Sequence, residues 1–208
     1  MNVIVFGATG GIGHHVVEQA LAAGHEVTAV ARRPAAITLQ HKCLHVVQGD
    51  VLNATTLTAP MCGQEAVFSS IGAPDRKPTV VYSQGVANIM KAMQSNGVRR
   101  LLCISATGLE PGPWWQRVFA KPMLWYFLKE SYTDLVRMEA EVRASQLDWT
   151  IVRPPKLDDG AHTGHYWWAA NEHLKHCFSI SRGDLADYMV SQVNNPATFR
   201  AVVEVASK

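Results

Sequence analysis

Residues 3–13 read Val-Ile-Val-Phe-Gly-Ala-Thr-Gly-Gly-Ile-Gly, an apolar run that ends in glycines at positions 7, 10 and 13. Glycine is needed where the backbone turns sharply and lies close to a pyrophosphate, because a Cβ atom there would clash with the ligand or exclude the required backbone angles. The helix predicted over residues 14–23 would direct its free N–H groups toward the phosphates. The spacing predicts a dinucleotide site at the first turn, although strand-to-helix turns also use glycine without binding a ligand.

The residues that follow complete a strand-turn-helix-strand unit. Gly24 is placed to end the helix, and residues 27–30 form a second short apolar run. The unit ends in Arg32-Arg33, whereas an NAD-specific site usually carries an acidic residue here for the adenosine ribose hydroxyls. Forked guanidinium donors suit a 2′-phosphate, so the pair favours NADP(H) over NAD(H), with Arg32 the stronger candidate. The alternative is a solvated basic turn.

Composition limits the classes of partner. The 208 residues are 48% hydrophobic, which fits one domain with an ample core, and 19 basic against 17 acidic residues give no general field for nucleic acid or a membrane surface. The four cysteines form no C-x-x-C pair, so we expect reduced thiols and a cytoplasmic protein. The histidine pairs 14/15, 162/165 and 173/176 belong to no Cys/His cluster, and we therefore expect no metal site.

Strand-like runs alternate with helical segments along the chain, which predicts an α/β fold with a parallel sheet between helices. We expect strands at 44–48, 66–71, 100–104, 149–152 and 202–205, and helices at 79–96, 132–146 and through 193 from a cap at Ser181 or Asp184. Because ligands of such sheets lie beyond the carboxyl ends of the strands, Asp50, Gly72 and Ser105 should meet the glycine turn at one edge. Asp50 would contact adenine or cap the next segment.

Residues 109–131 break this pattern with an aromatic and apolar insertion. Arg117, Lys121 and Lys129 keep its apolar runs far below the ~20 residues of a membrane span. It could pack on the core as a helical insertion, which is the default; cover the substrate as a lid that brings Trp114, Trp115 or Trp125 into the pocket; or contact a second subunit or a membrane surface.

Taken together, these segments resemble the atypical short-chain dehydrogenases/reductases of the NAD(P)-binding, NmrA-like type, and most of all their biliverdin-IXβ reductase/flavin reductase branch. The resemblance spans almost the whole chain and is more specific for fold and cofactor than for substrate. It implies a single-domain Rossmann-type fold, a doubly wound parallel sheet with helices on both faces, as a monomer or homodimer. The matching segments are residues 6–13, 49–51, 85–89, 105–106, 147–155, 163–164 and 181–186.

The same resemblance implies roles for individual residues. The pyrophosphate would lie against the glycine turn, the 2′-phosphate against Arg32, and the adenine against Asp50 and Val51. Gly72 would lie at the ribose and phosphate on the nicotinamide side, and the two prolines would flank the nicotinamide. Ser105 takes the place of a serine that the branch holds near nicotinamide and substrate. The cofactor residues implied are Gly7, Ala8, Thr9, Gly10, Gly11, Ile12, Arg32, Arg33, Asp50, Val51, Ile71, Gly72, Pro154 and Pro155.

Two departures from the family concern the chemistry. The chain has no Tyr-x-x-x-Lys pair, which disfavours alcohol/ketone interconversion by the usual proton relay. Lys156 stands where the branch places a histidine, and a cation there would stabilise the anion formed by hydride transfer or supply a proton; otherwise it binds a phosphate or faces solvent. We therefore expect an NADPH-dependent reductase of a planar conjugated acceptor such as a flavin, quinone or tetrapyrrole. The alternatives are an NADP(H)-binding sensor or assembly factor without turnover and, less favoured, a sugar-nucleotide epimerase.

Overall fold

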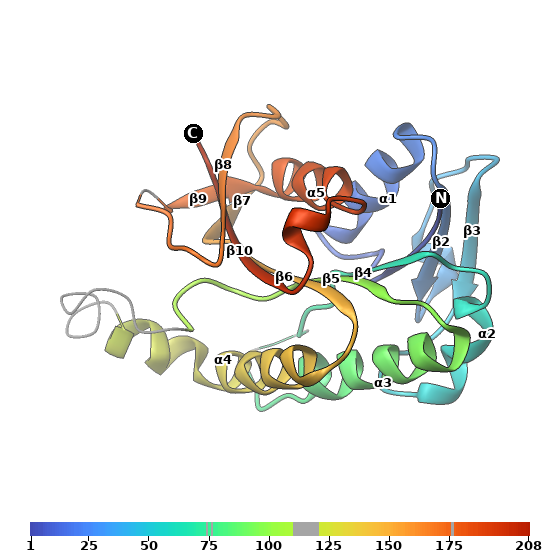
Figure 1. Ribbon diagram of the computed structural model, residues 1–208, viewed down its shortest axis with the longest axis horizontal. Coiled ribbons are helices and arrows are strands. Elements are labelled where there is room, and N and C mark those ends of the chain that lie inside the picture. Colours follow the sequence, from blue (N-terminus) through green and yellow to red (C-terminus); the bar gives the residue numbers. More distant parts are fainter. Residues whose placement is uncertain (74, 76, 110–120, 176) are drawn as a thin grey trace.

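A central sheet of eight strands organises the molecule (Figure 1). The computed structural model describes residues 1–73, 75, 77–109, 121–175 and 177–208. All neighbouring strands of the sheet are parallel except the last pair, in which β8 runs antiparallel to β10. In spatial order the strands are β3 (Leu44–Gln48), β2 (Glu26–Ala31), β1 (Asn2–Phe6), β4 (Ala66–Ser69), β5 (Arg100–Ile104), β6 (Asp148–Arg153), β10 (Ala201–Ser207) and β8 (Tyr166–Ala170).

Helices cover both faces of this sheet, as the sequence predicts. On one face lie α1 (Gly13–Ala22) and α5 (Arg182–Ser191), and on the other lie the short α2 (Thr58–Met61), α3 (Val81–Asn96) and α4 (Lys121–Ala144). The central strand β1 is buried on both faces: Val3 and Val5 pack toward α1 and α5, whereas Ile4 and Phe6 pack toward α3 and α4. A strand between two helical layers therefore reads as a continuous apolar run.

The chain reverses direction across the sheet between β1 and β4. From β1 it passes outward to β2 and β3, then returns to place β4 against the other side of β1. In open parallel sheets such a switch point leaves a crevice beyond the carboxyl ends of the strands. The glycine turn after β1 and the loop after β4 both open onto it.

Most predicted elements occur within about two residues of their predicted bounds, and the two predicted caps are present. Gly24 follows α1 with φ at +82°, and the Ser181 hydroxyl accepts a hydrogen bond from the Asp184 N–H at 3.0 Å as the N-cap of α5. The predicted start of the helix at residue 132 is wrong, because α4 begins at Lys121. Pro122 lies in its first turn, where the missing N–H costs no hydrogen bond.

Three strands in the C-terminal part are absent from the sequence prediction. β8 joins the sheet at its edge, and β7 (Lys156–Asp158) pairs in parallel with β9 (Ser179–Ser181) as a separate two-stranded sheet. Trp114, Trp115 and the side chain of Trp125 lie outside the residues that the structure describes. Of the helices that it does describe, none combines the length and apolar character needed to cross a membrane.

Candidate functional site

A cavity of about 680 Å³ opens at the switch point, beyond the carboxyl ends of the parallel strands. Its wall combines the turn after β1, the ends of β2 and β3, the loop after β4, the end of β5, one face of α4 and the start of α5. The structure thus brings together residues that the sequence analysis placed at one edge. The predicted site residues in the wall are Gly7, Thr9, Gly10, Gly11, Ile12, Arg32, Asp50, Val51, Ile71, Gly72 and Ser105.

The glycine turn is shaped by contacts within the protein. Gly7 has φ at +80°, and a Cβ atom on it would lie 2.5 Å from the Ser70 carbonyl oxygen. A Cβ on Gly13 would lie 2.0 Å from the Gly7 carbonyl oxygen. Both distances are far below van der Waals contact, so these two glycines are required by the turn itself. Ala8 is buried beneath the turn and is not part of the wall.

The start of α1 fits a phosphate group. Ile12 is the N-cap residue of α1, and no side chain forms a capping hydrogen bond there. The first turn of α1 also carries no acidic residue. Gly11 and Ile12 line the cavity at this point. Uncapped N–H groups at the start of a helix, together with the helix dipole, favour an anion. The structure therefore offers donors where the sequence analysis places a pyrophosphate.

Asp50 stabilises a turn and also lines the cavity. Its carboxylate accepts a hydrogen bond from the Leu52 N–H at 3.0 Å, and its carbonyl accepts one from the Asn53 N–H at 2.8 Å, so it stabilises the turn after β3. The residue also lines the cavity, as does the exposed Arg32. Arg33 is exposed and lies outside the wall. Of the two arginines, the structure brings only Arg32 to the cavity.

Ser105 at the end of β5 is held by a buried ion pair. Its hydroxyl donates to Glu139 Oε1 at 2.6 Å, and the same carboxylate oxygen accepts from Arg153 Nε at 2.8 Å. Each of the three residues is at least nine-tenths buried. Because the hydroxyl hydrogen is directed to Glu139, Ser105 faces the cavity as a hydrogen-bond acceptor. Nothing in the local sequence around Ser105 identifies Glu139 as its partner.

The two prolines and Lys156 lie beside the cavity without lining it. Pro154 is buried, Pro155 is half-buried, and the Thr107 N–H donates to the Pro154 carbonyl at 3.0 Å, which ties this loop to the end of β5. Lys156 is exposed at the start of β7, while its neighbour Leu157 lines the cavity. Successive side chains of a strand point to opposite sides, which accounts for the different environments of these two residues.

The sequence analysis missed several residues of the wall. Ser131, Tyr132 and Leu135 face the cavity from α4, and the Tyr132 hydroxyl donates to the Thr107 carbonyl at 3.3 Å. Burial raises the pKa of Tyr132, which keeps its phenol protonated. Arg182 at the start of α5 also lines the cavity. Helical spacing from residue 132 onward was a usable signal for the α4 face, but no local pattern points to Arg182.

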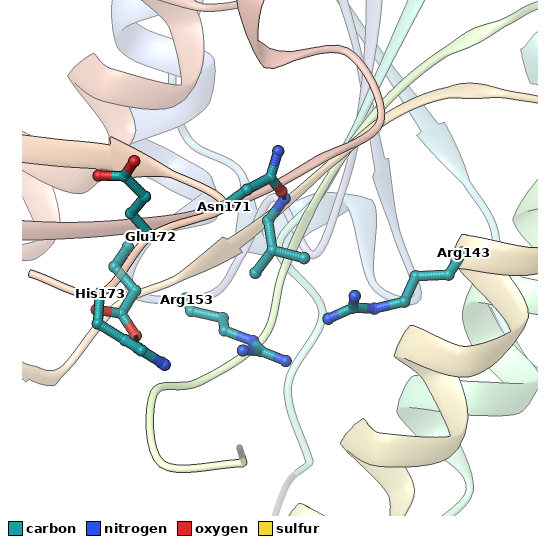
Figure 2. Close-up of a pocket in the computed structure, with 7 residues that line it drawn as sticks. Arg143, Arg153, Asn171, Glu172 and His173 are labelled. Atoms are coloured by element: carbon teal, nitrogen blue, oxygen red, sulfur yellow. Dashed lines mark hydrogen bonds and ion pairs between the residues drawn. The ribbon is translucent and has the colours of Figure 1, made fainter. Parts of the chain in front are cut away.

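A second pocket of about 180 Å³ lies between the end of α4, β6, β10 and the segment after β8 (Figure 2). Arg143 and Arg153 line this pocket, and both form ion pairs with Glu139. On the opposite wall Glu204 accepts from His173 Nδ1 at 2.8 Å. Arg143, Arg153 and Glu204 thus have charged or polar partners within the protein, which makes this pocket the weaker candidate for a ligand.

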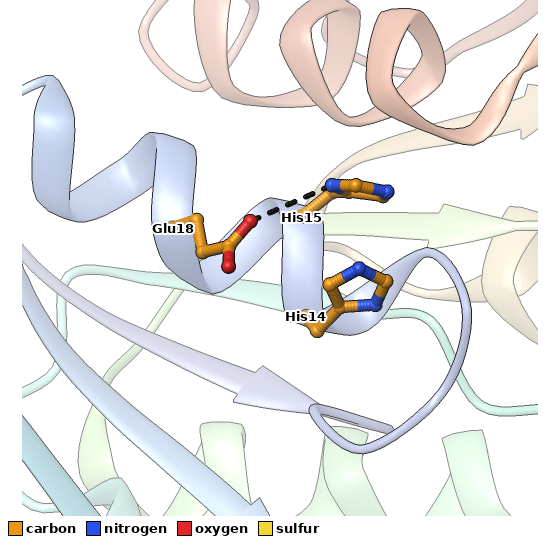
Figure 3. Close-up of side chains that lie close together, drawn as sticks. All are labelled: His14, His15 and Glu18. Carbon is orange, nitrogen blue, oxygen red and sulfur yellow. Dashed lines mark ion pairs between the residues drawn. The ribbon is translucent and has the colours of Figure 1, made fainter. Parts of the chain in front are cut away.

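A group of potential metal ligands occurs at the start of α1 (Figure 3). His14, His15 and Glu18 each offer one donor atom, and these atoms lie within 4.8 Å of one another. His14 Nδ1 bonds the Gly10 carbonyl at 3.0 Å, and His15 Nδ1 lies 3.6 Å from the Glu18 carboxylate. Burial and the neighbouring His14 lower the pKa of His15. His14 has a local role in this arrangement, because it fastens the first turn of α1 to the glycine turn.

Comparison with known proteins agrees with this geometry. A protein family described as NAD(P)H-binding matches residues 7–196. A Saccharomyces cerevisiae protein, UPF0659 protein YMR090W, is 25% identical over all of this chain and 93% of its own length. The oxidoreductase ylbE of Lactococcus lactis superposes with a TM-score of 0.85 at 20% identity, covering 100% of this chain and 91% of that one. A short-chain dehydrogenase/reductase of Veillonella parvula, solved in complex with NADP, gives 0.79 at 20% identity, covering 99% and 94%. At these identities the two structures show the shared fold alone.

Proposed function

Since the chain belongs to the NAD(P)H-binding family, we propose that it is an NADPH-dependent reductase that transfers hydride to a planar conjugated acceptor such as a flavin, quinone or tetrapyrrole. The observation that carries this proposal is the continuity of the cavity. One wall contains the glycine turn with its uncapped helix start, and the same cavity extends past Ser105 to an aromatic and apolar face of α4. A dinucleotide and a second planar molecule would then lie within contact of each other.

The preference for NADPH rests on Arg32. It is the arginine of the pair that lines the cavity, at the end of β2 and on the same wall as Asp50. A guanidinium group gives a 2′-phosphate two parallel donors. Asp50 has one carboxylate oxygen bound by the Leu52 N–H, which leaves the other oxygen to accept from the adenine edge.

When bound, the nicotinamide cofactor supplies the hydride. The part of the protein would be to place the acceptor against it and to exclude water. Ser105 would accept a hydrogen bond from an N–H group of the cofactor carboxamide or the acceptor, in a position fixed by Glu139. Tyr132 and Leu135 would form the surface on which a flat acceptor packs. A conjugated acceptor delocalises the incoming charge, so positioning can supply much of the rate enhancement.

The described residues of the cavity wall offer few groups that could transfer a proton during the reaction. On the face of α4 toward the cavity they include Ser131 and Leu135, four residues apart, and no lysine. Lys156 remains our proposed cationic residue beside the acceptor, although it lies outside the cavity wall. Replacing Lys156 or Ser105 by alanine should lower the turnover number more than the affinity for NADPH, and unchanged turnover in both variants would refute these roles.

The test of the reductase proposal is a direct assay. The purified protein is mixed with NADPH and, in turn, with FMN, a quinone and biliverdin, and the nicotinamide absorbance is followed. We expect NADPH oxidation with at least one of them. Oxidation with none, combined with tight NADPH binding and a ligand-dependent change in oligomeric state, would instead favour a sensor. The engagement of the Ser105 hydroxyl by Glu139 and the position of Lys156 are the observations that favour that second candidate.

The proposed setting is a reducing compartment such as the cytoplasm. Cys43, Cys62, Cys103 and Cys177 are all free thiols in the structure. Cys103 is fully buried in β5, where desolvation raises the pKa of its thiol and keeps it unreactive. It acts there as a small apolar side chain.

A further inference from the structure

The two-stranded sheet of β7 and β9 places two opposite charges side by side. In its register Asp158 stands opposite Ser181, the last residue of each strand. Asp159 and Arg182 therefore leave the sheet next to each other, and their side chains form an ion pair. Arg182 is at the same time the first residue of α5, whose N-cap Ser181 fixes the direction of the helix. The position of the Arg182 backbone is thus set by two elements.

The Arg182 side chain extends from α5 over the glycine turn. A Cβ atom placed on Gly11 would lie 2.8 Å from Arg182 Nε and 2.9 Å from its Cδ. A Cβ atom on Gly7 or Gly13 would meet backbone atoms, whereas the three atoms nearest to a Cβ on Gly11 all belong to the Arg182 side chain. The absence of a side chain at position 11 therefore gives the Arg182 side chain access to the glycine turn, which lines the cavity.

The partner that Arg182 has in the structure is an exposed one. The Asp159 side chain is 88% exposed, whereas the Arg182 side chain is 28% exposed. Ion pairs with such exposed carboxylates contribute little, because water and salt screen them. A pyrophosphate at the start of α1 would offer the guanidinium two oxygens in the geometry that it binds best. We therefore expect the guanidinium to exchange the Asp159 carboxylate for a phosphate group.

We propose that Arg182 binds the pyrophosphate of the dinucleotide and that Asp159 competes for the same guanidinium in the free protein. The proposal rests on the dinucleotide binding proposed above. Two elements from opposite ends of the chain would then bind the pyrophosphate. The glycine turn would supply backbone donors, and α5 would supply the Arg182 guanidinium, which can move between Asp159 and the ligand. Arg32 would recognise the 2′-phosphate, and Arg182 would act on either form of the cofactor.

Calorimetric affinities for three ligands test this division of roles. NADPH and NADH both carry the pyrophosphate, whereas adenosine 2′-monophosphate carries only the 2′-phosphate. Arg182→Met should weaken NADPH and NADH by a similar factor, about 10- to 100-fold, because it removes hydrogen bonds to a charged group. Its effect on adenosine 2′-monophosphate should stay within about twofold of the wild type. Arg182→Lys keeps the positive charge but loses the two parallel donors of the guanidinium. Its affinities for NADPH and NADH should therefore lie between those of the wild type and those of Arg182→Met.

The role of Asp159 has its own prediction. Asp159→Asn should tighten NADPH binding about two- to fivefold, since the competing charge is removed. In the Arg182→Met background the same change should have no effect, because a double-mutant cycle exposes coupling only where both partners act together. Arg99→Met is a matched control: Arg99 forms an ion pair with Asp148 at the amino ends of β5 and β6, the ends of the strands opposite the cavity, and its loss should leave all affinities unchanged.

Thermal denaturation of each variant checks that it is folded. The proposal is overturned if Arg182→Met changes NADPH affinity less than twofold, if it weakens adenosine 2′-monophosphate equally, or if Asp159→Asn weakens NADPH binding. These measurements do not depend on turnover. A protein that binds NADPH in this pattern but reduces no acceptor would refute the reductase proposal and leave this one standing.

Discussion

The two halves of the cavity wall are built by different means. Residues before 105 contribute mainly backbone: a turn of glycines, the ends of parallel strands and the uncapped start of α1. Residues from 105 onward contribute side chains held by partners distant in sequence, as Ser105 is by Glu139, 34 residues away. Backbone sites leave a compact sequence motif, because only certain residues permit the geometry. Side-chain networks leave no such motif, since each partner is ordinary in its own segment.

The largest effect should come from the network of the second half. Glu139→Ala removes the carboxylate that binds both Nε and Nη2 of the buried Arg153, and breaking a buried ion pair costs about 3–5 kcal/mol. Urea unfolding should show this loss in the free energy of unfolding. Glu141→Ala, two residues away on the exposed side of α4, is the control and should change it by less than about 0.5 kcal/mol. Similar values for both variants would mean that the network does not stabilise this half.

In the first half, the backbone geometry of the turn should control binding. The Cβ atom of Gly13→Ala would lie 2.0 Å from the Gly7 carbonyl oxygen, so the turn must shift, and we expect NADPH affinity to fall about 100-fold, or about 2.7 kcal/mol. Gly24→Ala is the comparison. Gly24 has φ at +82°, but a Cβ atom on it would meet no other atom within 4 Å. Gly24→Ala should therefore lower the free energy of unfolding by about 1 kcal/mol and leave the NADPH affinity unchanged. Normal NADPH binding by Gly13→Ala would contradict the prediction.

The first half should also distinguish the two forms of the cofactor. Arg32→Ala should weaken the binding of NADPH about 10-fold and that of NADH hardly at all, because only NADPH carries the 2′-phosphate that Arg32 would bind. Arg33→Ala should have a smaller effect, since Arg33 lies outside the cavity wall. Fluorescence titration with both cofactors measures the difference. Equal weakening of NADPH and NADH by Arg32→Ala would remove the basis for the NADPH preference.

The smallest effect concerns pH and the second half. Burial raises the pKa of Asp184, but hydrogen bonds from the Gly164 N–H, the Thr163 N–H and the Thr163 hydroxyl outweigh it, and the net shift is downward. A lowered pKa in the folded state means that the stabilisation is present above the unfolded value of about 3.9 and is lost as pH falls through the folded value. Asp184→Asn should therefore lose about 1 kcal/mol at neutral pH. The difference from wild type should shrink near pH 2, and a pH-independent difference would exclude this origin.

The same contrast explains what the sequence could predict. Strands 44–48 and 100–104 match the structure because apolar runs between turn residues define them locally. The residues Tyr-Trp-Trp-Ala-Ala of β8 form a strand only because β10, more than thirty residues later, supplies its pairing partner. The contact of Arg182 with Gly11 has the same character, since it depends on how α5 packs on α1. The cavity residues of the first half were therefore accessible from the sequence, and the wall formed by α4 and α5 was not.

The place of β10 in the sheet has a consequence for the newly made chain. β10 lies between β6 and β8, pairing in parallel with one and antiparallel with the other, yet the ribosome makes both neighbours first. Until β10 emerges, β6 presents an unpaired strand edge, and β8, whose Trp167 and Trp168 are partly exposed even in the finished fold, has no partner in the sheet. Open edges and exposed aromatic residues promote aggregation. During synthesis the chain is therefore exposed to aggregation until β10 is inserted between β6 and β8.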